Sequence, residues 1–210
     1  MTQKNRLKGG LINRNNPQQF EFNGQSMQGF EGDTLASALL ANDIRLVGRS
    51  FKYHRPRGML SAGSEEPNAL VELRTGNRKE PNSRATTTEL YDGLVANPQN
   101  CWPSLNFDFL GVNDLFAPFL TAGFYYKTFM WPSAFWEKVY EPVIRRAAGL
   151  GSASLEPDPD SYDKGFLHAD LLIIGAGPSG LVAALTAARS GVRVIICLLY
   201  TSPSPRDETK

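Results

Sequence analysis

Three glycines spaced as G-x-G-x-x-G follow an apolar run and precede an apolar, alanine-rich segment. The motif consists of Gly175, Ala176, Gly177, Pro178, Ser179 and Gly180. Gly175 permits a sharp turn, Gly177 lets a pyrophosphate approach the backbone, and Gly180 lets a helix pack closely on a strand. The free N–H groups of the first helical turn attract the anion. The pattern therefore predicts a dinucleotide-binding turn, and the alternative is a glycine-rich turn without a ligand.

A parallel strand–helix–strand unit must position this turn. Residues 169–174 have the character of a buried strand, and residues 192–196 form the second strand after the helical segment. A dinucleotide unit normally carries an acidic residue at the end of its second strand, where it holds the ribose hydroxyls. Leu198 stands at that place, and a Ser/Pro-rich stretch follows. We expect residues 167–197 to begin a Rossmann-type dinucleotide-binding domain that is truncated, and residues 198–210 to be a non-native tail.

The bulk composition excludes several classes of protein. The chain has 210 residues, a net charge of +1 and a hydrophobic fraction of 41%. This charge gives no general attraction to nucleic acids or anionic membranes. The aromatic-rich run at 107–131 is interrupted by charges and a proline, and its uncharged part is too short to span a bilayer. Two cysteines and a polar N-terminus favour a cytoplasmic protein, with neither a nucleic acid nor a membrane as partner.

Basic and aromatic residues alternate in residues 49–57, a pattern that is also found in nucleic-acid-binding proteins. The near-neutral charge favours a solvated or interface loop, or a loop that reaches the cofactor phosphates. His54 and His168 are the only histidines, and neither has carboxylates at ligand spacing. We therefore expect no metal site.

Residues 16–96 predict a small α+β domain. Asn23-Gly24 between alternating apolar residues predicts a β-hairpin. Apolar residues at helical spacing predict a helix that Asp33 caps and that Asn42-Asp43 ends. Further strands are expected at 69–73 and 85–91. This order of elements is typical of a ferredoxin-like sheet of the β-grasp type.

The remaining segments are an N-terminal arm and the connection between these two domains. Residues 1–15 are polar and predict a flexible arm, and residues 97–166 predict an aromatic- and proline-rich connector followed by a linker. The three tryptophans of this connector are expected to anchor its packing. Residues 133–148 have helical character, but Pro142 predicts a kink or a break.

Three long runs resemble the α subunit of heterotetrameric sarcosine oxidase. They are residues 48–58, 123–132 and 140–151, and the resemblance extends from about Arg6 to Cys197. That family oxidatively demethylates sarcosine to glycine, reduces O2 to H2O2, and releases the one-carbon unit as formaldehyde or as 5,10-methylenetetrahydrofolate. The resemblance implies that this chain is the N-terminal portion of such a subunit, inactive alone and a partner of the other subunits.

The same resemblance implies a division of cofactors between subunits. A non-covalent NAD, with FAD as the alternative, would lie on Gly175, Gly177, Pro178, Ser179 and Gly180. The flavins and the amine substrate would be held on or with a partner subunit, so no catalytic residue is expected in this chain.

The first hundred residues also resemble the ferredoxin-like domain that precedes such dehydrogenase subunits. In relatives that carry an iron–sulfur cluster, cysteines follow the Arg-Pro-Arg-Gly run, whereas residues 59–66 of this chain contain none. A [2Fe–2S] centre needs four thiolates, or histidine in place of two of them. We therefore expect the domain to lack the cluster.

Two other functions are compatible with the sequence. The chain could belong to a related FAD-dependent amine or opine dehydrogenase, or to a hydrogen cyanide synthase-like complex, with FAD at the glycine turn. It could also be a non-catalytic module whose ferredoxin-like domain only docks a partner.

Overall fold

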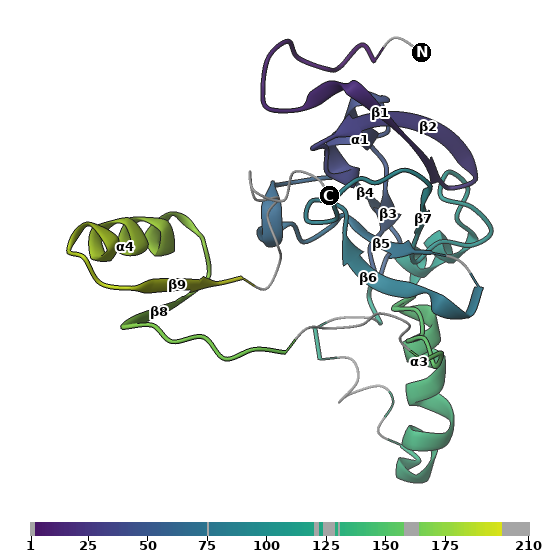
Figure 1. Ribbon diagram of the computed structural model, residues 1–210. Coiled ribbons are helices and arrows are strands. Elements are labelled where there is room, and N and C mark those ends of the chain that lie inside the picture. Colours follow the sequence, from purple (N-terminus) through teal and green to yellow (C-terminus); the bar gives the residue numbers. More distant parts are fainter. Residues whose placement is uncertain are drawn as a thin grey trace. The chain divides into compact units, whose positions relative to one another are not determined.

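The computed structural model describes residues 3–74, 76–119, 122–123, 129, 131–157 and 164–198. It divides into two compact units, Met1–Glu156 and Pro157–Lys210 (Figure 1). Apart from Leu198, the expected non-native tail lies outside the described residues. The first two residues of the expected arm and residues 120–121, 124–128, 130 and 158–163 of the expected connector and linker lie outside them as well.

The first unit is built on a mixed five-stranded sheet with the strand order β2-β1-β7-β5-β6. The strands are β1 (Asn13–Phe22), β2 (Gln25–Glu31), β5 (Leu70–Leu73), β6 (Glu80–Arg84) and β7 (Leu94–Pro98). β1 is antiparallel to β2 and parallel to β7, whereas β5 is antiparallel to both of its neighbours. A small α+β domain, as expected, therefore occupies this part of the chain. The short strands β3 (Gly48–Arg49) and β4 (Pro56–Arg57) form a separate hairpin.

The predicted hairpin at Asn23-Gly24 is confirmed. Phe22 pairs with Gln25, so a two-residue loop connects β1 and β2. Asn23 has φ +52° and Gly24 has φ +73°. Two consecutive positive φ angles are the requirement of a type I′ turn, which asparagine and glycine meet at the least steric cost.

Helix α1 (Leu35–Ala41) begins one residue later than predicted, because Thr34 and not Asp33 is its N-cap. The Thr34 hydroxyl accepts a bond from the Ser37 N–H at 3.2 Å, and the Ser37 hydroxyl accepts one from the Thr34 N–H at 3.0 Å. Asp33 instead accepts two bonds from the Arg6 guanidinium, at 3.0 and 2.7 Å. This ion pair fixes Arg6 to the segment between β2 and α1, and β1 begins at Asn13, so part of the expected flexible arm is ordered.

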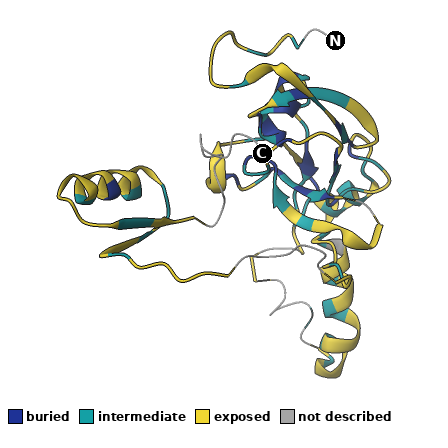
Figure 2. Cartoon of the chain, viewed as in Figure 1, coloured by how far each residue is buried: buried dark blue, intermediate teal, exposed yellow. Residues whose placement is uncertain are grey.

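The core lies between α1 and the sheet, where the buried residues are concentrated in Figure 2. Its fully buried side chains include Phe22, Leu35, Leu39 and Leu94. The prediction of a strand at 85–91 is wrong. Ala85 and Leu90 are buried in the core, but their segment forms turns, and the strand is the polar β6 just before it.

The connector contains several short helical segments. It contains the 3₁₀ helices η3 (Phe109–Phe116) and η4 (Ser133–Phe135), the π-helical turn η5 (Trp136–Tyr140) and helix α3 (Glu141–Ala147). Pro142 lies in the first turn of α3, where its missing N–H costs least, and the irregular π turn ends just before it. The helix type changes from π to α next to Pro142, but the backbone stays helical through Tyr140 and Glu141, so the chain is not broken there. No helix in the described ranges is both long enough and apolar enough to cross a membrane.

The second unit is the predicted strand–helix–strand motif. It consists of β8 (Leu171–Ile174), α4 (Pro178–Arg189) and β9 (Val194–Cys197), and the two strands are parallel with Leu171 opposite Val194. Gly191, with φ +82°, follows the C-cap Ser190 and turns the chain back toward β9. Most of the second unit is coloured as exposed in Figure 2. Many of its apolar side chains, such as Leu172 and Val182, are largely exposed.

Candidate functional site

The glycine turn connects the end of β8 to the start of α4. Gly175 has φ +99°, a value that favours glycine over every other residue. Its N–H donates to the Cys197 carbonyl at 2.8 Å, so the turn is fixed to the end of β9. The chain therefore reverses sharply at the carboxyl ends of two parallel strands, which is where α/β proteins bind ligands.

Gly180 brings helix α4 against this turn. A Cβ atom at Gly180 would lie 2.1 Å from the Gly175 carbonyl oxygen and 3.4 Å from Ile173 Cγ2. The first of these distances is impossible without moving the backbone. Close packing of the helix on the strand thus requires glycine here, in the role that the motif predicts.

Gly177 faces open space. It is the N-cap of α4, with φ −69° and ψ 175°, and a Cβ atom there would meet no atom within 4 Å. No side chain caps the helix, and Pro178, which has no N–H to satisfy, begins it. The first-turn N–H groups, including those of Ser179 and Gly180, have no acceptor within the helix. The open side of Gly177 and these donors can receive an anion.

A carboxylate for the ribose is missing from the described part of the second unit. Asp170 is the only acidic residue in 164–198, and it lies before β8, at the end of the strand remote from the turn. There it accepts a bond from the Arg193 N–H at 2.9 Å. Leu198 follows β9 at the place where the acid is expected. The turn therefore offers open space and N–H groups of the first helical turn, and these residues supply no acidic group for a ribose.

The basic loop at 49–57 is tied to the connector by a buried pair that sequence reasoning missed. His54 Nδ1 lies 2.7 Å from Asp108 Oδ2, and the two side chains are 0% and 1% exposed. The other carboxylate oxygen of Asp108 accepts bonds from the N–H groups of Trp102 and Leu110. Arg49 donates to the Leu105 carbonyl at 3.0 Å. His54 and Arg49 thus fix the loop to the rest of the first unit, while Arg55 and Arg57 remain exposed.

The residues present do not fit an iron–sulfur cluster. The sequence contains only two cysteines, and they lie in different units. Cys101 is half-buried; burial, and then the negative charge of Asp108, raise the pKa of its thiol. Within the described ranges, no group of three or more histidine, cysteine or acidic side chains could hold a metal ion. A [2Fe–2S] centre with four protein ligands cannot be assembled from this set.

A buried carboxylate lies in the loop at 59–69 instead. Glu66 is 1% exposed, and its two oxygens accept bonds from four backbone N–H groups. Leu60 and Ser61 donate to Oε2 at 2.7 and 2.6 Å, and Asn68 and Ala69 donate to Oε1 at 2.7 and 3.3 Å. Burial by itself raises the pKa of Glu66, but the four N–H donors together outweigh it, so the pKa lies below its usual value.

We expect Glu66→Gln to remove part of the acid sensitivity of the first unit. Because the folded pKa is below the unfolded value of about 4.5, the ionised carboxylate stabilises the fold fully above pH 4.5. This contribution is lost as the pH falls through the folded pKa. Urea midpoints of the wild-type and Glu66→Gln chains should therefore differ at neutral pH and converge as the pH falls below 4.5 and through the lowered pKa of Glu66. A difference that stays constant over this range would contradict the expectation, and Glu65→Gln, at an exposed neighbour, is the control.

Comparisons with known proteins match both units. Residues 15–101 match the family model of a 2Fe-2S iron-sulfur cluster binding domain, and residues 170–199 match that of an FAD binding domain. Sarcosine oxidase subunit alpha of Rhizobium meliloti (strain 1021) is 68% identical over 189 residues, which are 90% of this chain and 19% of the relative. The subunit alpha of Corynebacterium sp. (strain U-96) is 34% identical over 191 residues, which are 90% of this chain and 15% of the relative.

Among solved structures, L-proline dehydrogenase from P. horikoshii superposes with a TM-score of 0.42 at 17% identity, over 88% of this chain and 25% of that chain. This likeness is too small to identify the fold. The chain spans about a fifth or less of the curated relatives that it matches. At the glycine turn, the family match favours a flavin dinucleotide, and the expectation of NAD as the primary cofactor gains no support from it.

Proposed function

The chain is homologous to sarcosine oxidase subunit alpha over nine-tenths of its own length, and from this premise we propose that it is a segment of an oxidoreductase subunit of that type. Its first unit would be a ferredoxin-like domain of the β-grasp type. The strand order, with β1 and β7 parallel at the centre of the sheet, supports this assignment. The second unit would begin a Rossmann-type domain.

The glycine turn, in this proposal, holds the pyrophosphate of an adenine dinucleotide. The observation that carries the proposal is the open side of Gly177 at the N-terminus of α4, in a turn that Gly180 keeps tight. The backbone N–H groups of Ala176, Gly177, Ser179 and Gly180 would donate to the phosphate oxygens. The family match favours FAD, while NAD has the same ADP moiety and would use the same donors. The bound dinucleotide would accept or pass on a hydride.

The reaction of the whole complex would be the oxidation of sarcosine. Sarcosine, O2 and water would give glycine, formaldehyde and H2O2, or the one-carbon unit would be transferred to tetrahydrofolate. We assign the oxidation of the amine to a partner subunit and no catalytic residue to this segment. The role of this segment would be to hold the dinucleotide and to join the other subunits.

A related FAD-dependent amine dehydrogenase is the second candidate. It is favoured by the match of residues 170–199 to an FAD binding domain, a match that is not specific for sarcosine. In both candidates the turn has the same role, and the amine substrate and the final electron acceptor differ.

An assay of the assembled complex tests the proposed activity. We expect peroxide to form from sarcosine and O2 when the intact subunit, meaning the full-length polypeptide that carries this segment, is assembled with its partners. The rate should fall to background when this subunit is omitted. Turnover of another secondary amine with an artificial acceptor, and not of sarcosine with O2, would favour the second candidate. A rate that does not depend on this subunit would contradict both.

A further inference from the structure

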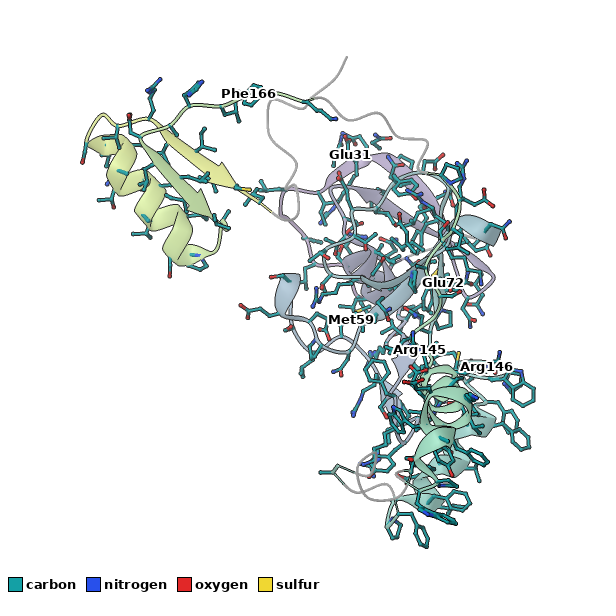
Figure 3. All side chains as sticks on the ribbon, turned by 90° about the horizontal axis from the view of Figure 1, so that it is seen from below. Glu31, Met59, Glu72, Arg145, Arg146 and Phe166 are labelled. Atoms are coloured by element: carbon teal, nitrogen blue, oxygen red, sulfur yellow. The ribbon has the colours of Figure 1, made fainter. Side chains whose placement is uncertain are left out.

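The loop at 59–69 is organised from within by one side chain. It contains the single 3₁₀ turn η1 (Gly63–Glu65) and no other regular structure between β4 and β5. Met59, which begins the loop, is labelled in Figure 3. Glu66 reaches back to Leu60 and Ser61 and forward to Asn68 and Ala69, so its carboxylate joins the two ends of the loop.

The outside of the loop is held by two further bonds. The Thr86 hydroxyl donates to the Gly63 carbonyl at 2.6 Å, and Arg84 Nε donates to the Glu66 carbonyl at 3.3 Å. Both donors come from the end of β6 and the turns after it. The loop is therefore fixed at its periphery to the end of β6 and the turns after it, while the Glu66 carboxylate accepts bonds from four N–H groups within the loop.

The carboxylate has no capacity left for another ligand. An ionised carboxylate offers about four acceptor sites, and four N–H groups of this loop occupy them. Removing a charge from water is costly unless it is fully bonded, and here each N–H bond to the charged oxygen is of the stronger, charge-assisted kind. Glu66 is thus a satisfied internal anion and has no free oxygen with which to bind a metal ion.

We propose that the Glu66 carboxylate organises the loop at 59–69 in the way that a bound cluster would. The domain matches the cluster-binding family but has no set of thiolates to hold a cluster. The thiolates and sulfides of a cluster also accept hydrogen bonds, so the carboxylate offers the loop an acceptor of the same kind. The domain would then fold without iron. This role lies in the first unit and is independent of the dinucleotide proposed for the second.

Amide hydrogen exchange in the 210-residue chain tests the proposal. We expect Glu66→Ala and Glu66→Gln to speed exchange in the peptide that covers 59–69 by at least about tenfold, with little change in the peptides of β1 and β7. Glu65→Gln, at the exposed neighbour, should leave this exchange unchanged. If Glu66→Ala fails to fold, the isosteric Glu66→Gln still reports on the charge. Wild-type exchange rates in both Glu66 variants would overturn the proposal.

A metal analysis tests the expectation that the domain folds without iron. Wild-type chain, incubated anaerobically with ferrous iron, sulfide and a thiol reductant and then desalted, should retain no stoichiometric iron and show no visible charge-transfer band. The rate of exchange in 59–69 should be the same before and after this treatment. Retention of iron and sulfide by the first unit, with slower exchange in this loop, would overturn the proposal.

Discussion

Replacement of Gly177 by aspartate should empty the glycine turn of nucleotide while leaving helix α4 intact. Gly177 has an extended backbone that any residue adopts, and a Cβ atom there meets nothing within 4 Å. Aspartate is also a better N-cap than glycine, so the helix gains an acceptor for its free N–H groups. A bound pyrophosphate would meet both the added side chain and its negative charge. We expect the nucleotide content of the intact subunit to fall at least about tenfold.

Gly165→Asp is the matched control, because it makes the same change at an exposed glycine of the same unit with nothing within 4 Å. It should leave the nucleotide content unchanged. Gly180→Ala serves a different purpose. Its Cβ atom would lie 2.1 Å from the Gly175 carbonyl oxygen, so it damages the turn with or without a ligand. Full occupancy in Gly177→Asp would mean that the dinucleotide does not lie on this turn.

The second large effect is expected at Asp108, in the first unit. Asp108→Ala removes the partner of buried His54 and the acceptor for the N–H groups of Trp102 and Leu110. A buried polar group that loses its hydrogen-bond partner typically costs about 1–3 kcal/mol, and several such groups lose their partner here, which is a large share of a stability of about 5–15 kcal/mol. We expect the urea midpoint to fall by at least about 1 M. Fluorescence can follow it, because the three tryptophans all lie in this unit.

Asp114→Ala provides the comparison. Asp114 pairs with Arg55 at 3.0 Å, but both side chains are more than half exposed to solvent, and such pairs contribute about 0–1 kcal/mol. Asp108→Asn, which keeps an acceptor oxygen, should fall between the two. Equal urea midpoints for Asp108→Ala and Asp114→Ala would show that the buried pair does not hold the loop and the connector together.

The elements that could be predicted are those specified by neighbouring residues. Asn23-Gly24 requires only its own turn geometry, and the glycine motif specifies the turn that joins β8 to α4 from residues close in the sequence. Strand β6 escaped prediction because its residues are polar and it lies at the edge of the sheet, where no alternation is needed. The segment that follows, residues 85–91, forms turns that pack on the core. Its buried residues therefore give it a sequence pattern similar to that of a strand.

The features that could not be predicted depend on distant or competing contacts. His54 and Asp108 are separated by 54 residues, and no local pattern connects them. Asp33 has the sequence context of a helix cap, but the guanidinium of Arg6 competes for its carboxylate. Glu66 follows exposed Glu65 and has the appearance of a second surface charge. The only sequence feature that could have suggested its role is a loop without cysteines in a domain of this type.

The nucleotide content of the intact subunit tests the central claim most directly. The subunit would be purified without added cofactor and denatured, and the released small molecules would be identified by chromatography and absorbance. We expect close to one adenine dinucleotide per subunit, with a flavin spectrum if it is FAD and without one if it is NAD. A correctly folded subunit that releases neither would contradict the assignment of the glycine turn as a dinucleotide site.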